Sequence, residues 1–171
     1  MMKKSLLLLL FSIFVFHSSP GMAEIEVIFS PRERIKESIL KGVESTTSTL
    51  DLAIHEITSL DMAQALLKAK QRGVKVRLIV DSKRAKAKSS QVTSLINQGI
   101  PVKTLGGKGR GVMNHRFAIF DGKRVLAGSF DWTEASEKWN YENIIILTEG
   151  EGVAAYQKEF DGLWREKRVI K

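Results

Sequence analysis

The stretch GVMNHRFAIFDGKRVLAGSFDWT, residues 111–133, decides the fold. It holds two apolar runs, Val112 to Phe120 and Val125 to Phe130, joined across Asp121-Gly122. Two strand-like runs separated by an Asp-Gly pair are typical of a β-hairpin. We therefore expect two neighbouring antiparallel strands here.

Polar residues in this stretch stand at the ends of the predicted strands. Alternate residues of a strand share a face, so we expect Asn114 and Arg116 on one side and His115 on the other. Ser129 and Asp131 follow the second strand at once.

A third polar group, Tyr141-Glu142-Asn143, precedes an apolar run over residues 143–147. Polar clusters at the ends of several core strands favour one shared cleft. Ordinary turns and helix caps would give the same spacing, so the pattern alone leaves both interpretations open.

Upstream of the hairpin, strand-like and helical segments alternate. Ser30-Pro31 resembles an N-cap followed by a first-turn proline, which predicts a helix starting there. The predicted strands are 24–29, 50–57, 74–80, 100–105 and 143–147, and the predicted helices follow Ser30 and span 61–72, 91–97 and 153–165. Alternation of this kind predicts an α/β sandwich, a mixed β-sheet flanked by helices.

The first 23 residues have the pattern of a secretory signal peptide. Lys3 and Lys4 precede an apolar run over residues 5–16, and small residues follow at 18–23. We expect an exported protein, periplasmic or secreted, with residues 24–171 forming one domain. An uncleaved N-terminal anchor is the alternative.

Charge and cysteine content narrow the partners. The chain has 27 basic and 19 acidic side chains; residues 1–23 hold two of the basic ones and no acid, which leaves 25 against 19. A basic surface favours polyanions such as nucleic acid or anionic lipid, although a basic protein without such a ligand has the same composition. The chain has no cysteine, so it has neither disulfides nor thiolate metal ligands.

Residues 111–143 resemble the HKD signature of the phospholipase D-like superfamily: His-x-Lys, four residues, Asp, six residues, Gly-Ser, then aromatic-Asn-Trp-Thr and a later Glu. The Gly128-Ser129 pair sets the register. In that register Asn114 stands at the His position, Arg116 at the Lys, Asp121 at the Asp, Ser129 at the Ser, Asp131 at the Asn and Glu142 at the Glu. The order of elements over nearly all of residues 24–171 is also similar to the small single-motif bacterial endonucleases of this superfamily.

The resemblance implies a metal-independent phosphodiesterase with no cofactor. In the family, the His attacks phosphorus to form a phosphohistidine, while the Lys, Ser and Asn hold the phosphoryl oxygens and the Glu orients the His. A covalent intermediate of this kind divides one difficult displacement into two easier ones. Single-motif members form homodimers in which two motifs meet, so we expect a homodimer that hydrolyses nucleic acid.

The sequence departs from the family at its central positions. Asn114 has no basic nitrogen with which to attack phosphorus, and Arg116 keeps the charge of Lys in a different geometry. Asp131 adds a negative charge, which we expect to be paired with Arg116. A single His-to-Asn replacement would explain Asn114, whereas Arg116 and Asp131 favour natural divergence.

Two histidines and two basic loops complete the candidate site. His115 would need an irregular strand to turn toward the cleft and act as nucleophile, and His55 is a candidate proton carrier or phosphate contact at the end of its strand. The loops span residues 83–88 and 106–111; the second carries Lys108 and Arg110, whose charge and neighbouring backbone amides we expect near a bound phosphate.

Two other functions remain open. The first is a phospholipase D-type hydrolase of phospholipids, and the second is an inactive nucleic-acid-binding pseudoenzyme that has lost its nucleophile.

Overall fold

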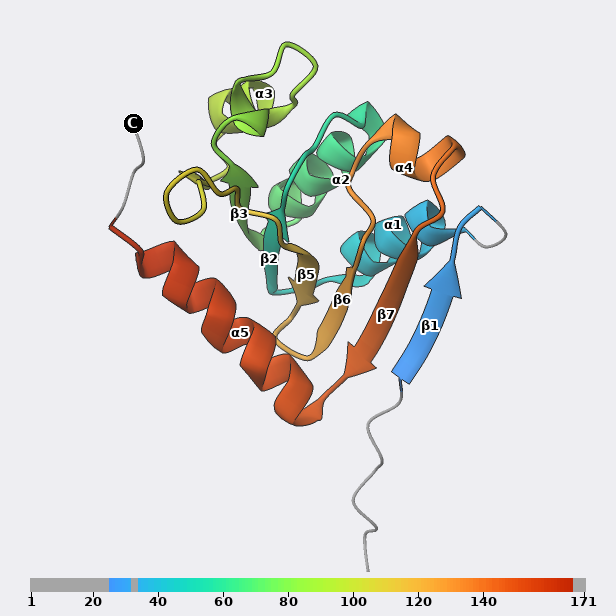
Figure 1. Ribbon diagram of the computed structural model, residues 1–171. Coiled ribbons are helices and arrows are strands. Elements are labelled where there is room, and N and C mark those ends of the chain that lie inside the picture. Colours follow the sequence, from blue (N-terminus) through green and yellow to red (C-terminus); the bar gives the residue numbers. More distant parts are fainter. Residues whose placement is uncertain (1–24, 32–33, 168–171) are drawn as a thin grey trace, which may run out of the picture.

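The computed structural model describes residues 25–31 and 34–167, so the predicted signal segment, residues 1–23, lies outside the described residues. The elements along the chain, drawn in Figure 1, are β1 (Ile25–Phe29), α1 (Ile35–Ser45), β2 (Thr49–Ile54), α2 (Leu60–Gln71), β3 (Lys75–Asp81), η1 (Arg84–Lys86), α3 (Val92–Asn97), β4 (Val102–Leu105), β5 (Arg116–Phe120), β6 (Arg124–Gly128), α4 (Glu134–Lys138), β7 (Asn143–Thr148) and α5 (Gly150–Arg165).

The strands form one mixed sheet in the order β1-β7-β6-β5-β2-β3-β4. β2, β3 and β4 are parallel, and the other neighbours are antiparallel. As a result, the carboxyl ends of β1, β2, β3, β4 and β6 meet the amino ends of β5 and β7 at one end of the sheet. We call this the site end and the opposite one the far end; the predicted α/β architecture is confirmed.

Each face of the sheet has its own apolar core. α1, α2 and α3 cover one face, while α5 crosses the other (Figure 1). Within β5, Ala118 and Phe120 belong to the first core, whereas Phe117 and Ile119 belong to the second. The alternation expected for this strand is confirmed.

The hairpin turn follows from its two residues. Asp121 has φ 53° and Gly122 has φ 65°. Two successive positive φ values are those of a type I′ turn, whose twist matches that of the flanking strands. The predicted Asp-Gly hairpin is confirmed.

The predicted start of the first helix is wrong. α1 begins at Ile35, and Ser30 does not cap it. The Ser30 hydroxyl instead donates to Asn140 O (3.1 Å) and accepts from Glu142 N (3.1 Å), so it fixes the segment that leads into β7. The serine serves a distant backbone because β1 pairs with β7.

Three further features differ from the sequence prediction. The short helices η1 and α4 were not expected, and β5 begins at Arg116 rather than at Val112. Asn114 and His115 therefore lie just before the strand, at the site end.

Candidate phosphodiester site

Arg116 is the first residue of β5 and pairs in register with Ile54 of β2. Its Nε lies 2.8 Å from Asp131 Oδ2, and its Nη1 donates to Asn114 Oδ1 (3.0 Å). The Nε–H is not aligned with the carboxylate, so this contact is an ion pair rather than a directed hydrogen bond. The predicted pairing of Arg116 with Asp131 is confirmed.

Asp131 also fixes the chain after β6. Its Oδ1 accepts from Glu56 N (3.1 Å), and the next residue, Trp132, forms a bridge with Ile57. Trp132 is buried in the core. The segment after β6 is thus held against the end of β2, which places Asp131 beside Arg116.

Ser129 and Glu142 meet where β6 ends and β7 begins. The Ser129 hydroxyl donates to Glu142 Oε2, and Asn140 Nδ2 donates to Glu142 Oε1 (2.9 Å). β7 passes so close that a Cβ on Gly128 would lie 2.0 Å from Asn143 O. Only glycine fits at 128, so the Gly-Ser pair of the motif has a steric cause.

A hollow of about 270 Å³ opens beside Arg116, on the side of the sheet that α5 covers, and Asp131, Ser129 and Glu142 do not line it. It is lined by Asn114, His115, Arg116, Phe117, Ala127, Gly128, Asn143, Ile145 and Tyr156. It brings the position of the family nucleophile together with the ends of β6 and β7. Among the described residues, no group of three His, Asp or Glu side chains is arranged to hold a metal ion.

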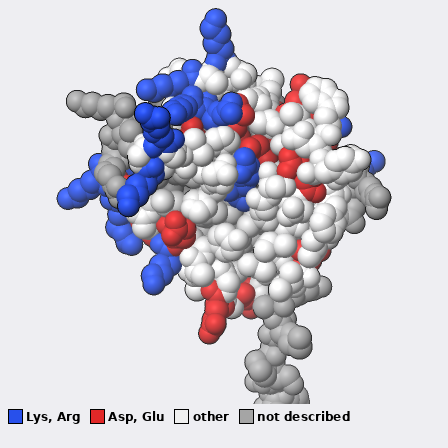
Figure 2. Space-filling view, viewed as in Figure 1, with Lys and Arg blue, Asp and Glu red and all other residues white. Residues whose placement is uncertain are grey.

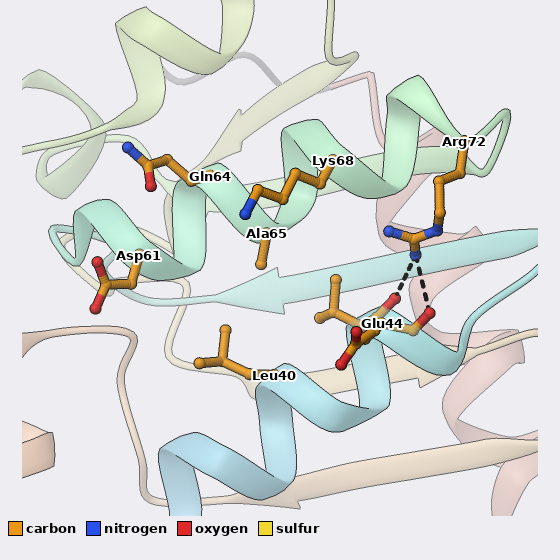
Figure 3. Close-up of a pocket in the computed structure, with 8 residues that line it drawn as sticks. Leu40, Glu44, Asp61, Gln64, Ala65, Lys68 and Arg72 are labelled. Atoms are coloured by element: carbon orange, nitrogen blue, oxygen red, sulfur yellow. Dashed lines mark hydrogen bonds between the residues drawn. The ribbon is translucent and has the colours of Figure 1, made fainter.

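A larger hollow of about 380 Å³ lies elsewhere, between α1 and α2 (Figure 3). Arg72 closes one end of it by donating to Val43 O (2.8 Å) and Glu44 O (3.2 Å). None of the predicted site residues lines it. We therefore place the site by its chemistry, at the end of the sheet, rather than by cavity size.

His115 points away from Arg116. Its Nε2 lies 3.3 Å from Glu159 Oε1 on α5, and its ring packs edge-on against Phe117 with ring centroids 5.5 Å apart. The imidazole thus lies on the α5 side with Phe117, as strand alternation predicts, although His115 lines the same hollow as Arg116.

His55 is tied to the segment that precedes Asn114. Its Nδ1 lies 3.0 Å from Met113 O, and its Nε2 accepts from Arg84 Nε (3.3 Å). These partners assign the proton to Nδ1. Met113 N in turn donates to the buried Asp81 (3.1 Å). The backbone N–H and C=O of Met113 are thus both hydrogen-bonded to side chains. No sequence pattern predicted this role of Asp81; only its place at the end of a strand could have pointed to it.

The basic loops lie beside this cluster. Figure 2 shows Lys and Arg side chains gathered at the upper left, around the ends of β3 and β4. Lys108 and Arg110 are exposed on a tight turn in which Gly107 N donates to Gly111 O (3.1 Å) and Gly111 N donates to Lys108 O (3.0 Å). The backbone amides of Gly107 and Gly111 are used by the turn itself, so they are not available to a phosphate. The expectation that Lys108 and Arg110 lie near a bound phosphate stays a prediction.

Asp121 does not join the other motif residues. It lies at the far end of β5 and accepts from the backbone amides of Thr47, Ser48 and Thr49 and from two of their hydroxyls. Burial opposes ionisation, but these amide hydrogen bonds hold the pKa of the carboxyl well below its usual range. The length of β5 separates Asp121 from Asn114, so its role is to fasten the hairpin to β2.

The mixed sheet and the polar groups at one of its ends agree with the phospholipase D-like class. The profile of the family described as "Cardiolipin synthase, PLD-like domain" matches residues 39–164, and the chain belongs to this family.

Relatives and solved structures agree with this assignment. The chain is 37% identical over 120 residues to the mitochondrial cardiolipin hydrolase of Chlamydomonas reinhardtii, covering 70% of this chain and 53% of that protein. It is 40% identical over 118 residues to the one of Xenopus laevis, covering 69% and 55%. The chain thus spans about half the length of these relatives.

Two bacterial proteins of solved structure share the fold. NucT from Helicobacter pylori superposes with a TM-score of 0.75 at 25% identity, covering 84% of this chain and 96% of that one. Nuc from Salmonella typhimurium, a phospholipase D family member, gives 0.75 at 23% identity, covering 86% and 97%.

The relatives correct one expectation. Their names place them in mitochondria, which contradicts the prediction of an exported, periplasmic or secreted protein. A short basic and apolar start does not by itself specify a compartment. Among residues 25–31 and 34–167, no helix has the length and apolar character needed to cross a membrane.

Proposed function

We propose that this protein binds the phosphodiester backbone of nucleic acid at the site end of the sheet, through its side chains rather than through a metal ion. The observation that carries the proposal is Arg116 at the mouth of the hollow. Its Nε forms the ion pair with Asp131, and its Nη1 donates to Asn114. Within the described part of the chain, no group accepts a hydrogen bond from its Nη2. A guanidinium edge facing a cleft is a phosphate ligand.

The exposed basic residues of the two loops near the site favour nucleic acid over a small phosphodiester as the ligand. Arg84, Lys108 and Arg110 are exposed on the loops that follow β3 and β4, at the same end of the sheet as Arg116; β2 lies between these strands and β5. A row of cations beside the site would contact phosphates on either side of the central one. Membership in a phosphodiesterase superfamily agrees with this ligand.

The present chain supplies the binding half of the site and lacks the nucleophile. The Asn114 amide can neither attack phosphorus nor carry a proton, and the His115 imidazole is directed to Glu159 on α5. We therefore infer that hydrolysis is at least about a thousandfold slower than with histidine at 114, as for other enzymes that lose a nucleophile. Binding of the backbone is the function that the site supports best.

We also propose a homodimer with two such sites facing each other. Ile25 and Val27 of β1 are 62% and 46% exposed, on an edge strand that should otherwise avoid apolar residues. Val27 pairs with Ile145, which lines the hollow beside Arg116. This apolar surface is continuous with the site, so a two-fold contact there would bring two sites together. Sedimentation of the wild type as a dimer, and of Val27→Glu as a monomer, would support it; a monomeric wild type would refute it.

Binding of fluorescent single-stranded DNA in EDTA tests the proposed function. We expect Arg116→Gln to weaken binding about tenfold or more, because a charged phosphate contact is lost. Arg124→Gln is the matched control, since Arg124 lies at the far end, over the ring of Phe120. It should change the dissociation constant less than about twofold. Equal affinity of Arg116→Gln and wild type would contradict the proposal.

Phospholipid is the second candidate ligand, favoured by two exposed aromatics. Trp139 and Tyr141 are 69% and 90% exposed just before Glu142, and such residues anchor proteins at membrane interfaces. The relatives named as cardiolipin hydrolases agree with it. If the protein binds cardiolipin vesicles but not DNA, and a Trp139→Ser, Tyr141→Ser variant loses vesicle binding, the lipid proposal replaces the nucleic-acid one.

A further inference from the structure

Arg116 already has an anion beside it. The Asp131 carboxylate lies 2.8 Å from Nε, and the two side chains are only 20% and 14% exposed. The pair is therefore screened less by solvent than a surface ion pair. A phosphate that approaches the Nε edge of the Arg116 guanidinium therefore meets Asp131 Oδ2.

The charges of the motif residues at the site end, without the basic loops, sum to a negative value. Arg116 contributes one positive charge, whereas Asp131 and Glu142 contribute one negative charge each, and Asn114 is neutral. Glu142 lies beside Ser129 and Asn140, neither of which carries a charge. An anionic diester would be repelled by the two carboxylates, an effect that is strong at a few ångströms in a partly buried site.

We propose that Asp131 is a built-in competitor for the phosphate. Its Oδ2 occupies one edge of Arg116, and a diester binds with full strength only when that carboxylate gives up the guanidinium. Asp131 thereby sets the affinity and charge selectivity of the site. This inference rests on the proposed function, because it assumes that Arg116 contacts the phosphate.

The two oxygens of Asp131 have separate roles, which makes the idea testable. Oδ1 accepts from Glu56 N, and Oδ2 faces Arg116. Asparagine keeps an oxygen for Glu56 and removes the charge beside Arg116. The Asp131→Asn variant therefore changes the competition while the backbone contact is retained.

The experiment measures dissociation constants for single-stranded DNA by fluorescence anisotropy in EDTA. We expect Asp131→Asn to bind about tenfold tighter or more, because the phosphate no longer has to displace a carboxylate from Arg116. Glu134→Gln is the matched control: it removes one exposed carboxylate of α4 that pairs with Lys138, and it should change affinity less than about twofold. Combined with Arg116→Gln, Asp131→Asn should give no comparable gain, because the competition requires the guanidinium.

The outcomes separate the two proposals. If Arg116→Gln weakens binding but Asp131→Asn does not tighten it, the competitor role is wrong and the proposed function stands. If Arg116→Gln has no effect, the proposed function itself fails. Should Asp131→Asn prove unfolded by circular dichroism, Asp131→Ser must show the same gain, and the absence of a gain overturns the inference.

Discussion

Asp121 and Asp131 lie at opposite ends of the sheet and differ in what surrounds them. Asp121 at the far end accepts from three backbone amides and two hydroxyls, all from Thr47, Ser48 and Thr49. Asp131 at the site end has one backbone donor and one guanidinium that another anion can take. A carboxylate saturated by its own backbone stabilises the fold, whereas one that shares a cation can take part in binding.

The closest backbone approach at the site end gives the largest expected effect on stability. Gly128→Ala places a methyl group where Asn143 O already stands, so β6 and β7 must separate. We expect a loss of about 3 kcal/mol in the free energy of unfolding, measured by urea denaturation. Gly162→Ala in α5 is the control: its Cβ would meet no atom within 4 Å, and it should stabilise by about 0.5 to 1 kcal/mol. Similar values for the two variants would refute the steric account.

Removing the hydrogen bonds of Asp121 at the far end should lower the free energy of unfolding by nearly as much and leave DNA affinity unchanged. Asp121→Ala leaves three amides without their acceptor, and we expect a loss of about 2 to 3 kcal/mol. Asp121→Asn keeps an oxygen and tolerates the positive φ, so its loss should be smaller. DNA affinity measured on the same samples should be unchanged. A clear loss of affinity would mean that Asp121 takes part in the site after all.

Acid should weaken the same hydrogen bonds, because it protonates the Asp121 carboxylate. The pKa of Asp121 is lower in the folded state than in the unfolded chain, so its contribution is complete above the unfolded value of about 4 and is lost as the pH falls below it. The free energy of unfolding, measured from pH 6 down to pH 3, should fall less steeply for Asp121→Asn than for the wild type. Parallel curves would show that other carboxylates account for the acid sensitivity.

His115 gives the smallest expected effect. It faces Glu159 across an exposed contact on α5, so His115→Ala should cost less than about 1 kcal/mol and leave DNA binding within twofold of the wild type. The comparison uses the anisotropy assay in EDTA. A large loss of affinity would place this imidazole in the site and remove the distinction between the two faces of β5.

The sequence predicted most of the fold because its elements follow simple periodic patterns. The Asp121-Gly122 turn and the alternation in β5 need only local information. The start of α1 could not be predicted, because Ser30 hydrogen-bonds to residues near β7 that are remote in the chain. The short helix α4 was missed because five residues carry too little of a helical period.

The motif register predicted Asn114, Arg116, Ser129 and Glu142 as candidates, and the structure places these four at one end of the sheet. The length of β5 explains why Asp121 lies at the other end. The contact between Ser129 and Glu142 depends on the pairing of β6 with β7, which no local pattern specifies. The contacts of Met113 with Asp81 and His55 likewise depend on the order of strands in the sheet.

Cleavage of DNA in EDTA by Asn114→His, measured beside the wild type, tests the central claim most directly. The claim is that the binding half of a phospholipase D-like site is present and only the nucleophile is missing. It predicts cleavage by Asn114→His at a rate at least about a thousandfold above the wild type. Equal cleavage by the wild type, or a folded Asn114→His variant that binds DNA and does not cut it, would contradict the account.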